Sequence, residues 1–170
     1  MVKARSQSLA RLGRRLRREE GTALVEFALV LPLLLLIVMG ILYFGRYENY
    51  ANDEIQLASS AARWASVNVN PGSGSGLTLQ QYVIKQASPE LATGSGDVSA
   101  IKVYIYFPSG STGAVNQPVR ACVTNTLNFI PILGLTNSTM VQTATMNVEQ
   151  AQTNWTPDSV ASVPSQCPTS

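Results

Sequence analysis

The sequence predicts an α+β protein with a long N-terminal helix, a second short helix and a three-stranded, antiparallel sheet. Residues 27–45 form an uncharged apolar run of 19 residues, and a helical pattern continues beyond it to Ser66. Three later segments are rich in β-branched and aromatic residues and are separated by turn residues. We therefore expect four parts: a basic arm (1–21), a helical segment (22–66), an α+β domain (67–152) and a Ser/Thr/Pro-rich tail (153–170).

The composition excludes several classes of site. The 170 residues include no histidine, which excludes His-based catalytic triads and His-containing zinc sites. Two cysteines, Cys122 and Cys167, are too few for a Cys-only zinc site. The acidic residues are scattered, and no glycine motif follows a strand into a helix. We expect no enzymatic activity, no metal and no cofactor; an exported enzyme with an unfamiliar site is the alternative.

The charge is concentrated at the N-terminus. Residues 1–20 carry seven basic and two acidic side chains, a net charge of +5, whereas the other 150 residues carry five basic and eight acidic ones, a net charge of −3. Only a weakly charged flank follows the apolar run (Arg46, Glu48, Asp53 and Glu54). Basic flanks stay in the cytoplasm, so we expect residues beyond about 46 to lie outside it. A basic arm can also bind nucleic acid, but no aromatic or reader motif accompanies this one, and we expect no nucleic-acid partner.

The apolar run itself predicts one transmembrane helix. Its 19 residues span about 28 Å as a helix, close to the roughly 30 Å of a bilayer's hydrocarbon core. A buried core helix is the alternative, but the 104 residues after Ser66 are too few to surround a helix that is apolar on every side. The run is longer than a signal-peptide core and no A-x-A site follows, so we expect it to stay attached. Pro32 inside the run predicts a local kink.

Beyond the membrane the pattern predicts an amphipathic helix and then a small domain. The helix carries one apolar stripe, consisting of Tyr47, Ala51, Ile55, Ala58, Ala62 and Ala65. This stripe packs either on the domain that follows or on other subunits, or the helix is a plain stalk. Thr78 and Gln81 form a capping box for the short helix. Strands are expected at 98–107, 118–127 and 139–150, and the apolar loop Phe129–Leu133 is interpreted as a plug of the core rather than a membrane or partner contact.

A carboxylate at the edge of the span does not fit a plain anchor. Glu26 is flanked by apolar residues on both sides, where a charge costs up to roughly 3 kcal/mol. Taken alone, Glu26 either extends to the lipid headgroups or has a function. Its context is a basic leader, the small residue Gly21, and an apolar helix with glutamate at its fifth position. This arrangement resembles the processing site of type IV prepilins.

The resemblance implies a cut between Gly21 and Thr22 by a membrane prepilin peptidase on the cytoplasmic side. It also implies a role for Glu26, whose carboxylate would pair with the new α-ammonium of Thr22 on a neighbouring subunit, since an unpaired charge in an apolar setting is costly. Many pilins begin their mature chain with an aromatic residue or Met. This chain would begin with Thr22, which argues against a major pilin.

Residues 14–66 resemble the TadE-like family, the minor pilin-like proteins of bacterial tight-adherence (Flp-type) pilus assembly systems. The matching features are the Arg-rich arm, Gly21, the Val25–Ala28 stretch, the leucines around Pro32, Gly40 and Gly45, and the alanine-rich helix ending at Arg63. The resemblance implies a minor pilin or pseudopilin in the inner membrane with a periplasmic domain. The implied partners are the inner membrane, a prepilin peptidase, other pilin-like subunits and pilus assembly components. The alternative is an uncleaved single-pass protein whose outer domain is a binding or scaffold module.

The two cysteines are expected to pair. The charge asymmetry places residues 67–170 outside the cytoplasm, where thiols are oxidised. A Cys122–Cys167 disulfide would also hold a tail that, by its composition, we expect to be poorly ordered. Two free thiols or a bridge between subunits are the alternatives.

Overall fold

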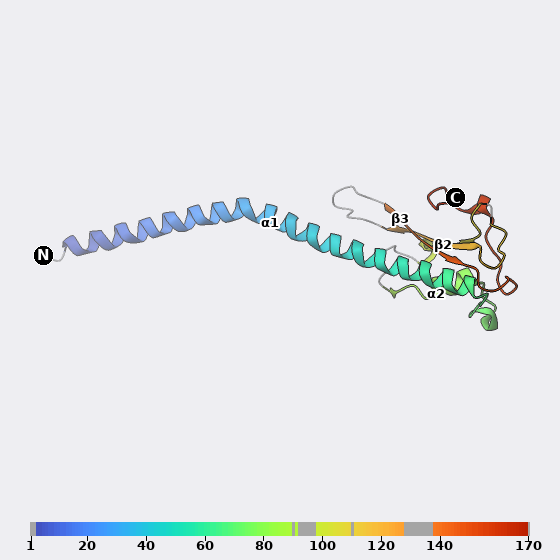
Figure 1. Cartoon of the computed structure of the whole chain (residues 1–170). Helices are drawn as coiled ribbons and strands as arrows, with labels where there is room; N and C mark the ends of the chain where they lie inside the picture. The colour runs from blue at the N-terminus through green and yellow to red at the C-terminus, as the bar shows by residue number, and fades with distance from the viewer. Residues whose placement is uncertain (1–2, 90, 92–97, 110, 128–137, 170) are drawn as a thin grey trace. The chain divides into compact units, whose positions relative to one another are not determined.

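The structure is a computed structural model that describes residues 3–89, 91, 98–109, 111–127 and 138–169, with side chains from residue 21 onward (Figure 1). The chain forms two compact units, residues 1–46 and residues 47–170. The predicted fold class is confirmed: the elements are a long helix, a short helix and a three-stranded sheet.

Helix α1 runs without interruption from Lys3–Ser66, which confirms that the apolar run and the amphipathic segment belong to one helix. Pro32 lies inside it. The helix ends where Asn68 takes a left-handed backbone conformation with a φ of 55°. Asparagine tolerates this conformation better than most residues, so the chain can turn here at little cost.

The sheet has the order β1-β2-β3 and both of its pairings are antiparallel, as predicted. Strands β1, β2 and β3 span Lys102–Tyr106, Pro118–Leu127 and Ser138–Asn147. The prediction for β2 is correct at both ends, and β3 ends earlier than predicted. The predicted start of β1 is wrong, because Val98–Ala100 form the 3₁₀ helix η2. The register explains this difference: β1 pairs with β2 only from Lys102, opposite Thr124.

Both helices pack on one face of the sheet. Helix α2 spans Leu79–Lys85, and Thr78 and Gln81 form the predicted capping box: the Gln81 backbone N–H donates to Thr78 Oγ1 (3.2 Å) and the Thr78 N–H to Gln81 Oε1 (3.1 Å). Alternate residues of the strands face the helices, as predicted for β1. The buried core on this face draws on α1, α2 and alternate residues of β1 and β2, and its larger members are Leu57, Leu79, Val83, Leu91, Ile101, Val103, Ile105, Val119, Val123, Val148 and Trp155.

The C-terminal tail covers the opposite face, which corrects the prediction that it is poorly ordered. Val163 and Cys167 are buried there against Tyr106 and Cys122. Asp158 closes the outer edge of β1: its backbone N–H donates to Ile105 O (2.7 Å), and its carboxylate accepts from Ile105 N–H (2.8 Å). The tail's composition misled the prediction because a few apolar residues and one covalent bond are enough to fix a segment of this length.

Other bonds fix the start of the same tail. The side-chain oxygen of Asn68 accepts from the backbone N–H groups of Thr153 and Asn154, both at 2.9 Å. The tail also contains the 3₁₀ helix η4, Val160–Ser162. The apolar loop Phe129–Leu133, interpreted as a core plug, lies outside the described residues.

Candidate functional site

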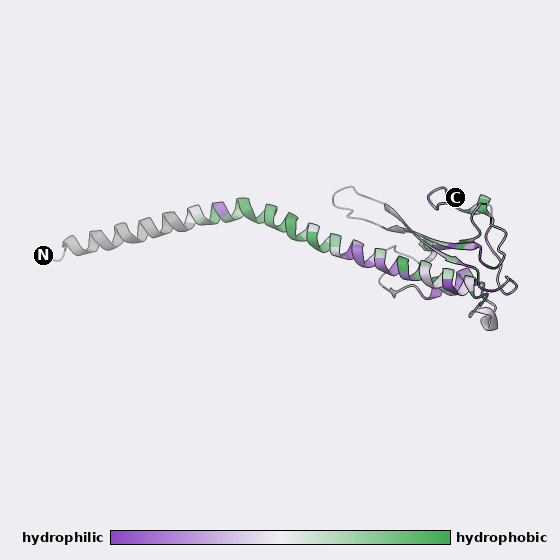
Figure 2. Ribbon diagram, viewed as in Figure 1, coloured by the Kyte–Doolittle hydropathy of each residue, from purple (hydrophilic) through white to green (hydrophobic). Residues whose placement is uncertain are grey.

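Within the first unit, residues 27–45 of α1 form a mostly apolar stretch, which is mainly green in Figure 2. From residue 21 to residue 46 every side chain is exposed except that of Tyr43, which is half-buried. The large apolar side chains between Leu24 and Phe44 keep between 37% and 74% of their surface exposed. Among the described residues, this is the one helix that is long and apolar enough to cross a membrane. Such a surface needs lipid or other apolar helices around it, so the helix suggests single-pass membrane anchoring.

Gly21, Thr22 and Glu26, the residues of the expected processing site, lie at the start of this surface. All three are exposed. Thr22 and Glu26 are four residues apart, so they lie on the same face of α1. A Cβ atom added to Gly21 would meet no atom within 4 Å, so the fold itself places no demand on a glycine there. Any requirement for a small residue at this position must therefore come from outside the chain.

The second part of α1 docks on the chain's own sheet, which decides among the interpretations of the alanine-rich stripe. The buried side chains of this part are Glu54, Leu57, Ala58, Ala61, Ala62, Ala65 and Ser66. The four alanines belong to the same buried core as Val119 and Val123 of β2. The predicted stripe was wrong at Ile55, which is 45% exposed. The buried face is shifted by one residue there, and it includes a carboxylate instead.

Glu54 was counted among the charged residues that flank the membrane, but its side chain is fully buried. It lies beside Asn125 of β2, which is also fully buried. Burial removes water from the carboxylate and raises the pKa of Glu54 to about 7, while the nearby Asn125 amide partly offsets this rise. The spacing of the alanines contains the signal that was missed, because a helix that buries residues 57/58, 61/62 and 65 also buries residue 54.

The structure joins Cys122 of β2 and Cys167 of the tail in a disulfide, with their Cα atoms 6.1 Å apart. Of the three expected possibilities, this is the bond within one chain. Around it, the Tyr106 hydroxyl donates to Pro168 O (2.6 Å), and the Arg120 guanidinium donates to the same oxygen. Burial raises the pKa of Tyr106, and the neighbouring Arg120 lowers it in part. The bond thus lies in a buried polar and aromatic setting that holds the end of the chain.

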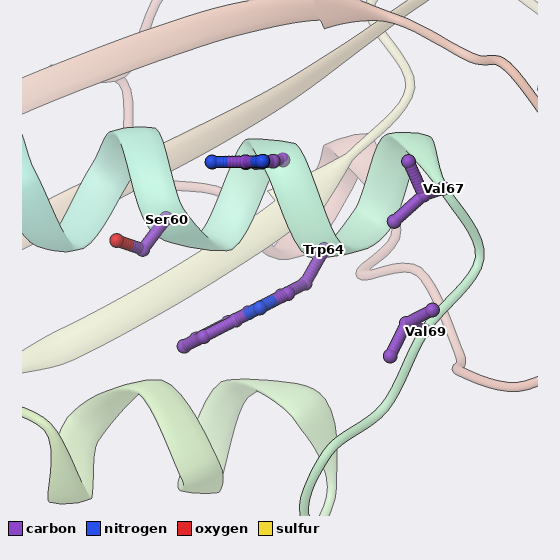
Figure 3. A pocket seen from close by; sticks show the side chains of 5 residues that line it. Ser60, Trp64, Val67 and Val69 are labelled. Carbon is purple, nitrogen blue, oxygen red and sulfur yellow. The ribbon is translucent and has the colours of Figure 1, made fainter.

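A shallow hollow lies on the outer side of α1, beside α2 (Figure 3). Its volume is about 380 Å³ and it is lined by Ser60, Arg63, Trp64, Val67 and Val69. The Trp64 ring extends towards α2 and meets Tyr82 edge-on, with ring centroids 5.2 Å apart. The lining combines an aromatic ring and a guanidinium with two valines, and aromatic and arginine side chains are enriched at protein contact surfaces.

An adjoining hollow of about 300 Å³ shares Ser60 and Trp64 with the first and extends to Asp53 and Ser88. The Asp53 carboxylate accepts a 2.5 Å hydrogen bond from the Ser88 hydroxyl. In the described part of the chain, no group of three or more Cys, Asp or Glu residues is placed to hold a metal ion.

The comparisons with known proteins point to the same helix. The family model described as TadE-like protein matches residues 21–63, about a quarter of the chain. Neither a curated protein nor a solved structure matches the chain. The match includes Gly21, Thr22 and Glu26, the exposed apolar part of α1 and most of its docked part. The chain therefore contains a TadE-like region, which begins at Gly21 and ends at Arg63.

Proposed function

We propose that this protein is a membrane-anchored minor pilin-like protein, or pseudopilin, that takes part in the assembly of a tight-adherence, Flp-type pilus. The observation that carries the proposal is the TadE-like match, which covers the exposed apolar helix together with its docked continuation. TadE-like proteins are structural components of pilus systems. An apolar helix that buries nothing within its own chain is suited to contact lipid first and neighbouring pilin-like helices afterwards.

The proposed topology places the N-terminal arm in the cytoplasm, the helix in the inner membrane and residues 47–170 in the periplasm. The excess of basic side chains before the helix supports this direction. The disulfide between Cys122 and Cys167 also supports it, because such bonds persist in the oxidising periplasm and not in the cytoplasm.

The proposed processing is cleavage after Gly21 by a prepilin peptidase. Removing 21 of the 170 residues leaves a mature chain of 149 residues that begins with Thr22. The start of the family match at Gly21 supports this proposal, because the matched region begins at the junction between arm and helix.

The intact mass of the protein isolated from its own host tests the cleavage. We expect the mass of residues 22–170. Gly21→Leu should block the cut, because the larger side chain fills the space that the peptidase requires, whereas Gly21→Ala should be cut at least in part. The open surroundings of Gly21 make both variants harmless to the fold. A parent protein that still starts near Met1 would contradict the proposal and favour the uncleaved alternative.

Glu26 is proposed to neutralise the α-ammonium of Thr22 on a neighbouring subunit. Glu26→Ala should insert into the membrane as well as the parent, because the change removes a costly polar group from an apolar helix. It should nevertheless reduce the number of pili per cell. Glu48→Ala is the matched control, since Glu48 is an exposed glutamate on the same helix beyond the apolar run. Normal piliation by Glu26→Ala would show that the charge pair is not needed.

The uncleaved alternative, in which the outer domain is a binding or scaffold module, has one observation in its favour. The hollow beside Trp64 gives that domain an apolar contact surface that needs no cleavage. Trp64→Ala in an uncleaved protein should then abolish co-purification of assembly components, whereas Gly21→Leu should leave it unchanged.

A further inference from the structure

Glu54 marks the place where α1 meets the second unit's sheet. From residue 21 to residue 53 no side chain of the helix is buried, and Glu54 is the first that is. The next buried residues along the helix, Leu57 and Ala58, are apolar. Tyr50 and Asp53 touch the domain before it, but the first side chain of the helix that is fully buried there is an ionisable group.

Among the described residues, none gives Glu54 a partner that would stabilise a charge there. Both carboxylate oxygens of Glu54 and both amide atoms of Asn125 are buried without a hydrogen bond. On the neighbouring strand β3, Met140 is paired with Asn125, and it is apolar and also buried. Leaving such polar atoms unsatisfied is costly, so a fold keeps them only where something compensates.

The other titratable groups nearby do not supply a counter-charge. On α1, Tyr50 packs against the core and the Asp53 carboxylate is bonded to Ser88. Lys102 of β1 is exposed, and it pairs with Thr124, whose side chain lies on the opposite face of the sheet from that of Asn125. Residues 128–137 contain no ionisable side chain, and Glu90 and Asp97 lie outside the described residues. Desolvation and the Asn125 amide are the influences that act on the Glu54 carboxyl.

We propose that Glu54 and Asn125 form a proton-controlled latch: the protonated Glu54 keeps the first docked turn of α1 on β2, and loss of the proton releases this turn. A neutral carboxyl can donate its O–H to the Asn125 side-chain oxygen and remain in a dry interface. The carboxylate left when the proton passes to water has no charged partner there and gains by moving into solvent. The alanine-rich turns that follow are held by apolar contacts, which do not depend on pH.

The sign of the effect follows from proton linkage. The docked form holds the Glu54 proton up to a pKa of about 7, whereas a released carboxyl has the ordinary value of 4.5. A rise in pH therefore favours release. Between pH 6 and pH 8, linkage between these two values makes the equilibrium constant for release rise by about tenfold. Within the second unit, the first docked turn of α1 is thereby held more tightly in acid than at slightly alkaline pH.

Amide hydrogen exchange on the full chain in lipid nanodiscs tests the latch at pH 6 and pH 8. Protection factors, which are corrected for the intrinsic pH dependence of exchange, should fall by about tenfold for residues 51–57 and stay unchanged for residues 61–66. Glu54→Gln should remove the fall, because its neutral side chain cannot lose a proton. Asp53→Asn is the matched control: it removes the adjacent carboxylate and should leave the fall in place.

A second variant keeps the test decisive if Glu54→Gln does not fold. Asn125→Leu removes the amide that lowers the pKa of Glu54, so the midpoint of the change in protection should move to higher pH. Flat protection in the parent protein, an equal fall in Glu54→Gln, or an unmoved midpoint in Asn125→Leu would each overturn the latch.

Discussion

Helix α1 contains two stretches that share a secondary structure but depend on different surroundings. In residues 21–46 the apolar side chains surround the helix, and none is buried within the chain. In residues 47–66 they form a single stripe that faces the sheet. The difference shows that the distribution of apolar side chains around a helix indicates what surrounds it. Apolar side chains on all sides require lipid or partner helices, and a single apolar stripe requires one packed neighbour. Substitutions in the two stretches should therefore act on different properties.

The largest expected effect concerns the domain alone. Cys122→Ser together with Cys167→Ser opens a loop whose ends are 45 residues apart, and should lower the free energy of unfolding of the domain by about 4 kcal/mol. Both tryptophans of the chain, Trp64 and Trp155, belong to the second unit, so their fluorescence during urea unfolding reports on it selectively. Membrane insertion should be unchanged. A domain that unfolds at the same urea concentration in both forms would show that the tail is held without the bond.

A matched pair of substitutions tests the comparison within the helix. Ala61 is fully buried against the sheet, whereas Ala28 is exposed. Ala61→Leu should destabilise the domain by about 1–3 kcal/mol, because a tightly packed interface has no room for three more carbons. Ala28→Leu should leave its stability unchanged, with urea unfolding as the measurement. Equal effects of the two changes would mean that the helix does not dock as described.

The smallest expected effect lies in the short helix. Thr78→Ala removes the hydroxyl that accepts from the Gln81 N–H, and should cost about 1 kcal/mol in the same unfolding experiment. Thr78→Ser retains a hydroxyl and should cost much less. If serine and alanine are equally destabilising, the methyl group of Thr78 and not its hydroxyl stabilises the start of α2.

Local patterns in the sequence predicted the elements whose causes are local. The capping box at Thr78 needs only residues three positions apart, and β2 is bounded by the Pro118 turn and by the end of an apolar alternation. The start of β1 could not be predicted in this way, because it depends on where β2 offers a partner. The burial of Glu54 was missed for a related reason. A charged residue is assumed to be exposed, so the stripe of buried alanines was not continued one turn further, to residue 54.

The packing of the tail could not be predicted from local patterns either. The tail residues follow no helical or strand pattern, and they are held in place by groups that are distant in the sequence, such as Asn68, Ile105 and Cys122. The processing site stays a prediction from family resemblance, since the fold uses none of Gly21, Thr22 or Glu26 in its core. Sequence patterns thus indicated the apolar helix more fully than the packing of the domain.

The position of Cys167 also determines when, during export, the disulfide can form. Cys167 follows its partner by 45 residues in the sequence, and that partner lies in the central strand of the sheet. In the proposed topology the domain crosses the membrane in sequence, after the anchor. The sheet therefore receives this covering layer only after the chain has been exported as far as Cys167. A chain that stopped before Asp158 would lack both the bond and the contacts that close the edge of β1, and periplasmic proteases could recognise it by that exposed face. The disulfide would then mark a domain that has been exported through Cys167 before the subunit enters assembly.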